Sequence, residues 1–191
     1  PDATIETVVA IAPRFGGINL EDIAAPQCFY IEDELQKRLS IPIMHDDQHG
    51  TAVVVLAGLI NATRYIKKDL SACKVVLVGA GAAGIAIAKL LTQYAQPTIV
   101  AVDSKGVITT SRSDLTPEKQ MLAQLSKNDG STSLEQAIKG SDIFIGVSRS
   151  GLLTEAMVRT MANNPIIFAL ANPEPEILPT VAKAAGAAVV A

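Results

Sequence analysis

Short apolar runs alternate with amphipathic stretches along most of the chain. The runs at 74–78, 98–102, 143–147, 166–171 and 187–191 are rich in Val, Ile, Leu, Phe and Ala, as buried parallel strands are. Apolar residues recur at helical spacing in the segments 82–94, 116–126, 133–139, 154–162 and 176–184. This alternation predicts an α/β fold built on a Rossmann-like doubly wound parallel sheet.

The first 50 residues follow a different pattern and indicate part of a second lobe at the N-terminus. Residues 1–12 have a helical pattern, and two short apolar runs at 16–20 and 41–44 each lead to an acidic pair. A long helix predicted over 51–67 connects this part to the first strand of the sheet. We therefore divide the chain into a lobe at 1–50 and a sheet domain at 51–191, with a cleft between them.

Composition and charge exclude several classes of protein. Hydrophobic residues make up 49% of the chain and charged residues 18%, which is typical of a globular domain. The net charge is −3 and no basic cluster is present, so nucleic-acid binding is not expected. No apolar stretch is long enough to span a bilayer, so no membrane partner is expected. Cys28 and Cys73 lie outside any CxxC pattern, which favours reduced, buried thiols and a cytoplasmic protein.

A glycine-rich segment directly follows the predicted strand 74–78 and opens a predicted helix. It reads Gly-Ala-Gly-Ala-Ala-Gly from Gly79 to Gly84, which is the GxGxxG pattern. Its first glycine permits a tight turn, its second lets the backbone approach a pyrophosphate, and its third lets the helix pack closely on the strand. The helix N-terminus offers free N–H groups to phosphate. We therefore expect a dinucleotide to bind at Gly79, Gly81, Ala82, Ala83 and Gly84.

An acidic residue in the expected place strengthens this interpretation. Asp103 follows the second predicted strand, about 20 residues beyond the glycines, where dinucleotide-binding folds hold the adenosine ribose. A carboxylate there favours NAD, because it repels the 2′-phosphate of NADP. Lys105 lies two residues further on and could neutralise that phosphate, so NADP remains possible.

Two acidic pairs stand at corresponding ends of the two short apolar runs. Glu21-Asp22 follows the first run, and His45-Asp46-Asp47 follows the second. Carboxylates that converge from two strands suit Mg²⁺ or Mn²⁺, which prefer oxygen ligands. On spacing alone, solvated loop acids explain the pairs equally well. His45 and His49 lack the helical HExxH context of a zinc site, so we expect one to pack or hydrogen-bond and the other to face solvent.

Taken together, these segments resemble the malic enzymes. Residues 15–23 (FGGINLEDI) are similar to the family's metal-binding segment, and residues 45–52 (HDDQHGTA) to the second acidic segment of its small bacterial type. Segments 78–84, 102–106, 145–148 and 168–173 resemble its cofactor domain in the same order. The resemblance covers nearly the whole chain. The acidic segments are its specific part, because many dehydrogenases share the glycines.

The resemblance implies an activity and a metal site. The activity is oxidative decarboxylation of malate to pyruvate, with NAD or NADP and with Mg²⁺ or Mn²⁺. Glu21, Asp22 and Asp47 correspond to the metal ligands, so residues 1–50 become part of a metal and substrate lobe. Asp46 corresponds to the catalytic-site carboxylate that orients the catalytic lysine.

The resemblance also implies contacts on the cofactor side. Thr51, Val147 and Ser148 are expected to lie against the dinucleotide. Asn172 is expected to meet the substrate or the nicotinamide ribose, at the carboxyl end of a strand, where α/β sheets bind ligands.

Two residues essential to the family's chemistry have no matching motif. They are a lysine and a tyrosine that carry protons and precede this region, whereas this chain begins with Pro1. We therefore expect a fragment of a malate- and pyruvate-binding enzyme, inactive by itself, whose parent is a homodimer or higher homo-oligomer. A non-catalytic dinucleotide-binding module is the main alternative. The NAD domain of an amino-acid dehydrogenase is a second one, which the acidic pairs disfavour.

Overall fold

The computed structural model describes residues 1–127 and 129–191. The larger part of the chain forms a domain built on a six-stranded sheet. The strand order is β5-β4-β3-β6-β7-β8. The strands are β3 (Lys74–Val78), β4 (Thr98–Asp103), β5 (Gly106–Val107), β6 (Ile143–Gly146), β7 (Ile166–Ala169) and β8 (Val189–Val190). Neighbouring strands pair in parallel, except that β5 runs antiparallel to β4.

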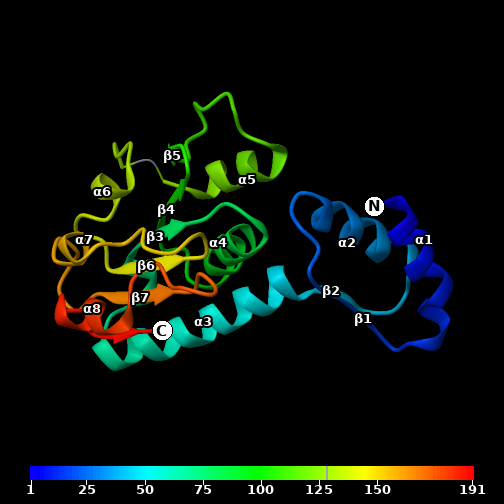
Figure 1. Cartoon of the computed structure of the whole chain (residues 1–191), viewed down its shortest axis with the longest axis horizontal. Coiled ribbons are helices and arrows are strands. Elements are labelled where there is room, and N and C mark those ends of the chain that lie inside the picture. The colour runs from blue at the N-terminus through cyan, green and yellow to red at the C-terminus, as the bar shows by residue number, and fades with distance from the viewer. Residues whose placement is uncertain (128) are drawn as a thin grey trace.

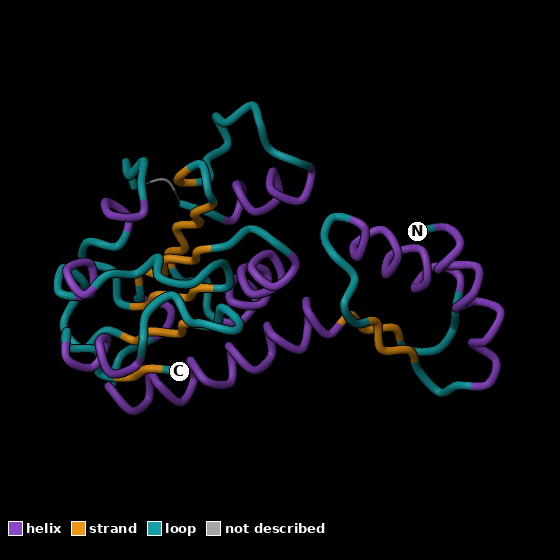
Figure 2. The backbone as a smooth tube through the Cα atoms, viewed as in Figure 1, coloured by secondary structure: helices purple, strands orange, loops and turns teal. Residues whose placement is uncertain are grey.

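Helices cover both faces of this sheet (Figure 2). Successive side chains of β3 alternate between two apolar layers, with Val75 and Leu77 in one and Val76 and Val78 in the other. The first layer includes buried residues of α3 (Asp46–Ile66), α4 (Ala82–Tyr94) and α5 (Pro117–Leu125). The second includes buried residues of α6 (Leu134–Ala137), α7 (Glu155–Val158) and α8 (Pro179–Ala184). The predicted doubly wound α/β fold is therefore confirmed.

The chain reverses its direction across the sheet at β3. From β3 it moves outward to β4, and it then crosses back to place β6 on the other side of β3. The loops that leave the carboxyl ends of β3 and β6 consequently diverge, and such a switch point is where open α/β sheets bind ligands. Gly79 and Val147 directly follow these two ends.

The N-terminal lobe has its own small core. It contains α1 (Asp2–Ile11), the 3₁₀ helix η1 (Ala12–Arg14), β1 (Ile18–Leu20), α2 (Gln27–Arg38) and β2 (Ile43–His45). Ile5, Leu20, Ile31 and Leu35 are buried together inside it. Strands β1 and β2 form a separate parallel pair. Figure 1 shows this lobe beside the sheet domain, with α3 running from it along the sheet.

The 21-residue helix α3 begins five residues earlier than the sequence pattern predicts. His45 is still extended, with φ −109° and ψ 115°, and Asp46 and Asp47 occupy the first helical turn. Carboxylates are favourable there because they complement the positive end of the helix dipole. Gly50 therefore lies inside the helix, where a Cβ would overlap the Asp46 carboxylate.

Other elements also differ from the prediction, and the helix predicted over 154–162 covers only α7 (Glu155–Val158). Helix α2 and the short strand β5 were not predicted at all. The last helix starts at Pro179, so Glu176 lies in the loop before it. The thiols match expectation, since Cys28 and Cys73 are both free and buried. Within the described ranges, no helix combines the length and apolar character needed to cross a bilayer.

Candidate functional site

The glycine turn after β3 is shaped by two close approaches. Gly79 has φ +116°, and a Cβ on it would lie 2.5 Å from the carbonyl oxygen of Val147. A Cβ on Gly84 would overlap the carbonyl oxygen of Gly79, so only glycine lets α4 pack this near β3. A Cβ on Gly81 would meet no atom within 4 Å. The structure therefore gives Gly79 and Gly84 an internal steric role, whereas the space beside Gly81 is open.

The N-terminus of α4 offers an anion site beside that open space. The first bond of the helix joins the Ile85 N–H to the Gly81 carbonyl at 3.1 Å. No side chain of the described residues caps the helix. The amides of Ala82, Ala83 and Gly84 precede the first helical donor, and the helix dipole adds positive potential there. This turn can hold a pyrophosphate in the way that GxGxxG predicts.

Asp103 ends β4 and is held by three donors. Arg112 Nη1 lies 2.8 Å from one carboxylate oxygen, Lys119 Nζ lies 2.7 Å from the other, and the Lys105 N–H donates at 2.9 Å. Burial raises the pKa of this carboxyl, but the bonds from Arg112 and Lys119 outweigh it and lower the pKa to about 2. Only 5% of the side chain is exposed. Asp103 is therefore ionised and already paired with two cations.

Lys105 and Arg112 also share a second carboxylate, Asp114. Lys105 Nζ lies 2.8 Å from it and Arg112 Nη2 lies 2.9 Å from it. Three cations thus surround two carboxylates at the end of β4, which leaves one formal positive charge. The sequence pattern identified Asp103 and Lys105 but gave no sign that Arg112 and Lys119 would approach them.

The two acidic pairs meet at one edge, because β1 and β2 are parallel and in register. Leu20 pairs with His45, so Glu21-Asp22 and Asp46-Asp47 both follow the last registered pair. The Asp22 N–H donates to Asp47 Oδ2 at 3.1 Å. No group of three or more His, Cys, Asp or Glu side chains within residues 1–127 and 129–191 is placed to hold a metal ion. A hydrogen bond therefore joins Asp22 to Asp47, and Glu21 precedes Asp22 at the same edge.

A buried glutamate that sequence reasoning missed supports this edge. The Glu32 carboxylate on α2 accepts bonds from the His45 N–H at 3.2 Å and from Gln48 Nε2 at 2.9 Å. His49 Nε2 lies 2.8 Å from it, although the His49 side chain is 47% exposed. Glu32 thus fixes the start of α3, where Asp46 and Asp47 lie.

His45 is fully buried next to Asp47. Neither of its ring nitrogens has a hydrogen-bond partner among the described residues, and Nε2 lies 3.6 Å from Asp47 Oδ2. Buried ring nitrogens usually have a partner, so this orphaned imidazole is a polar group aimed at the acidic edge. Of the two histidines, His45 is the packed one, while His49 is both half-exposed and hydrogen-bonded.

The remaining predicted contacts lie at the carboxyl ends of β6 and β7 and on α3. Ser148 and Asn172 are exposed in the loops after these strands, and Val147 is half-buried beside the glycine turn. Thr51 lies half-buried on α3. Between the two loops lies Glu176, a fully buried carboxylate that the sequence pattern placed in a helix.

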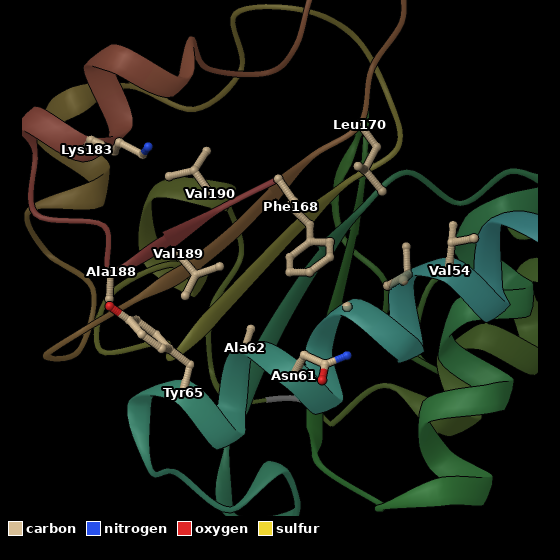
Figure 3. Close-up of a pocket in the computed structure, with 13 residues that line it drawn as sticks. Val54, Asn61, Ala62, Tyr65, Phe168, Leu170, Lys183, Ala188, Val189 and Val190 are labelled. Carbon is tan, nitrogen blue, oxygen red and sulfur yellow. The ribbon is translucent and has the colours of Figure 1, made fainter.

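Two of the larger hollows do not coincide with these residues. One, of about 720 Å³, is an apolar groove between α3 and the edge of the sheet, lined by Val54, Tyr65, Phe168, Leu170 and Val190 among others (Figure 3). Another, of about 520 Å³, separates α2 from α4 and α5. Neither is lined by the glycine turn or by the acidic pairs. The candidate site is therefore the strand-end surface and not a deep cavity.

A parallel sheet with a GxGxxG turn at its switch point and an uncapped helix N-terminus defines a dinucleotide-binding protein of the Rossmann class. The chain belongs to the malic enzyme family. The family model described as the NAD-binding domain of malic enzyme matches residues 48–188, and the model described as the malic enzyme N-terminal domain matches residues 1–36.

Individual relatives agree with this assignment. The chain is 53% identical to the bifunctional malic/malolactic enzyme of Bacillus subtilis over 99% of its own length and 47% of that protein. It is 50% identical to the NADP-dependent malic enzyme of Escherichia coli over 96% of its length and 24% of that protein. The crystal structure of an NAD-dependent malic enzyme from Thermotoga maritima superposes with a TM-score of 0.95, at 44% identity, over 100% of this chain and 51% of that one. The chain therefore spans about half or less of the length of these relatives.

Proposed function

We propose that the protein containing this chain oxidatively decarboxylates malate to pyruvate with NAD(P) and a divalent metal. One observation carries this proposal beyond dinucleotide binding. The register of β1 and β2 brings Glu21-Asp22 beside Asp46-Asp47, at the start of the helix that packs against α4 of the glycine turn. Such an acidic edge is not needed by a binding module or by an amino-acid dehydrogenase.

The residues divide the work of such a reaction between two surfaces. When bound, the nicotinamide accepts the hydride from C2 of malate, and the divalent ion acts as a Lewis acid toward the oxygens of the substrate. The glycine turn binds and orients the pyrophosphate. Thr51, Val147 and Ser148 would lie along the dinucleotide, and Asn172 would orient the substrate or the nicotinamide ribose. Asp46 would orient the lysine that takes the hydroxyl proton, in the space that Gly50 leaves for its carboxylate.

The acidic edge fits a hard divalent cation by the chemistry of its donors. Glu21, Asp22 and Asp47 supply carboxylate oxygens, the ligands that Mg²⁺ and Mn²⁺ prefer. The buried His45 Nε2, which has no hydrogen-bond partner among the described residues, lies 3.6 Å from Asp47 Oδ2 and supports a polar ligand at this edge. We propose these three acids as the metal ligands.

Titration calorimetry with Mn²⁺ tests the ligand set. Asp47→Asn should weaken Mn²⁺ binding by at least about tenfold, because an amide replaces a charged ligand. Asp33→Asn is a matched control, since Asp33 is an exposed acid on α2 that pairs with Lys37. Equal Mn²⁺ affinity in wild type and Asp47→Asn would exclude Asp47 as a ligand.

We propose that the cofactor site accepts both NAD and NADP. The expectation of NAD rested on a free carboxylate, and Asp103 is instead neutralised by Arg112 and Lys119. A 2′-phosphate meets a cluster with one formal positive charge, in which Lys105 is 67% exposed. Lys105→Ala should therefore weaken the binding of NADP⁺ more than the binding of NAD⁺. Lys127→Ala, at an exposed position, should change neither affinity. A wild-type preference for NAD⁺ beyond about a hundredfold would refute dual use.

Turnover itself is tested by following NAD(P)H absorbance with malate and Mn²⁺. We expect no signal above background from the 191-residue chain alone, since a positioned general acid or base contributes roughly 10²–10⁴-fold and no motif here supplies either. The complete protein of the same gene should form pyruvate, and Asp46→Asn should abolish most of that activity. A complete protein that binds NAD(P)⁺ but never yields pyruvate would support the module alternative instead.

Two further expectations from the sequence are also proposals. We propose a homodimer or higher homo-oligomer, which sedimentation velocity of the complete protein would show as a mass of at least two chains. We propose a cytoplasmic location, in keeping with two free and buried thiols. Fractionation that recovers the protein with a membrane pellet would contradict it.

A further inference from the structure

Glu176 is a buried carboxylate that none of the roles above explains. It lies in the loop between β7 and α8, and none of its surface is exposed. Burying a carboxylate is unfavourable unless strong hydrogen bonds compensate. In the described part of the chain, its partners are not Lys or Arg side chains but the backbone amides of two different loops.

The two bonds join the loops that follow β6 and β7. The Ser148 N–H donates to Glu176 Oε1 at 3.0 Å, and the Ala171 N–H donates to Glu176 Oε2 at 3.1 Å. Each oxygen thus bonds to one loop, two residues beyond the end of its strand. One carboxyl group therefore bonds to both loops, which fixes the distance between them.

The fold reserves space for this arrangement. A Cβ on Gly146, the last residue of β6, would overlap the Glu176 carboxyl group. The loop backbone is also tied to the same residue, because the Leu153 N–H donates to the Glu176 carbonyl at 3.1 Å. The absence of a side chain at Gly146 therefore provides the space that the Glu176 carboxyl group occupies.

The residues held in place are Ser148, which is expected to lie against the dinucleotide, and the loop that carries Asn172, which is expected to meet the substrate or the nicotinamide ribose. Ser148 donates directly to Glu176, and Asn172 follows Ala171, the second donor. The glycine turn is held separately, since Val147 N–H bonds to Val78 and Gly79 N–H bonds to Val102 within the sheet, at 2.9 and 3.0 Å. Loss of a bond at Glu176 should therefore disturb the β6 and β7 loops and leave the phosphate turn intact.

We propose that Glu176 is a positioning residue that sets the β6 and β7 loops for the nicotinamide half of the dinucleotide and for the substrate. The proposal rests on the proposed dinucleotide function and adds a residue that does not touch the ligand itself. It predicts that the two halves of the cofactor respond differently to a change at position 176.

Glu176→Gln tests this with little change in shape. A carboxamide has one oxygen and one NH₂ group, so in either orientation an N–H donor faces a backbone N–H donor at Ser148 or Ala171. Calorimetry should show NAD⁺ binding about tenfold weaker, because one loop is repelled. Binding of ADP, which lacks the nicotinamide nucleoside, should stay within about twofold of wild type. The matched control is Glu174→Gln, an exposed acid two residues away, which should alter neither ligand.

The outcomes separate the possible explanations. If Glu176 had a purely structural role, the substitution would weaken the binding of both ADP and NAD⁺ or the binding of neither. Either result overturns the proposal. If Glu176→Gln does not fold, NMR spectra of the backbone amides of the wild-type protein test the proposal. NAD⁺ should shift the amide signals of Ser148 and Ala171, and ADP should not. Absence of a difference between the ligands there also overturns it. Failure of wild type to bind any dinucleotide counts instead against the proposed function.

Discussion

Replacing each of two glycines in the same turn by alanine should impair different properties of the protein, ligand binding in one case and stability in the other. Gly81→Ala adds a methyl group that meets no protein atom within 4 Å, on a backbone with φ −90° and ψ −164° that alanine adopts freely. Gly84→Ala puts a methyl group onto the carbonyl oxygen of Gly79. The first change intrudes on the space for the ligand, and the second intrudes on the protein itself.

The expected magnitudes follow from those contacts. Forcing an extra methyl group into a packed site costs about 1–3 kcal/mol. For a chain of 191 residues each kcal/mol lowers Tm by roughly 2–4 °C, so Gly84→Ala should melt about 5 °C below wild type. Gly81→Ala at the helix N-cap should cost less than about 1 kcal/mol. Its NAD⁺ affinity should nevertheless fall at least about tenfold, because the backbone can no longer approach the pyrophosphate.

Thermal unfolding followed by circular dichroism and calorimetry with NAD⁺ measure both effects. Gly16→Ala is the control, because a Cβ there also meets nothing within 4 Å and the residue lies in the N-terminal lobe. It should match wild type in both assays. Wild-type affinity in Gly81→Ala would mean that the dinucleotide does not pass over this turn. A wild-type Tm in Gly84→Ala would mean that the helix and strand are less closely packed than described.

Three other predictions concern stability and reactivity. The pKa of Asp103 falls from its ordinary 3.8 to about 2 on folding, so its ionised form stabilises the protein above pH 4 by about 2 kcal/mol, and this stabilisation is lost as the pH falls toward 2. Urea titrations should therefore show Asp103→Asn less stable at pH 7, with a difference that narrows below pH 4; a constant gap would contradict the pairing. Glu32→Ala leaves three donors without their acceptor, should cost about 1–3 kcal/mol, and should speed hydrogen exchange at 43–48; unchanged exchange would refute its role. Burial raises the pKa of the Cys73 thiol to about 11, so it should react with a disulfide reagent only after denaturation; rapid labelling of the native chain would contradict this.

The sheet domain was predictable because its strands are buried on both faces. Their apolar runs are continuous, and the glycines mark where β3 ends. The N-terminal lobe was harder to predict, because most of α2 is polar and only Cys28, Ile31 and Leu35 carry its helical spacing. That spacing was present in the sequence and could have revealed the helix. The start of α3 was predicted five residues too late, because the carboxylates of Asp46 and Asp47 favour a helical first turn that the apolar spacing does not reveal.

The candidate site was predictable where a motif fixes backbone geometry and not where distant side chains meet. The glycine turn follows from local sequence, whereas the sequence placed the acidic pairs only at corresponding ends of two apolar runs, and their parallel register came from the structure. The pairing of Asp103 with Lys119, 16 residues away, and the bond from Ser148 to Glu176, 28 residues away, depend on loop paths that no periodicity encodes. Buried carboxylates such as Glu32 and Glu176 also look like ordinary surface acids in a sequence, because burial of this residue type is rare.

The continuity of α3 restricts how the length of this chain can change. The helix carries Asp46 and Asp47 in its first turn, while Gly58 further along faces the ring of Phe168, which a Cβ there would approach to 2.7 Å. Inserting one residue between these points would rotate the two carboxylates by about 100° around the helix axis relative to the sheet. Inserting seven would restore their direction but move them about 10 Å away. Insertions and deletions in related genes should therefore fall in loops such as 109–116, while the number of residues from Asp47 to Gly58 stays constant.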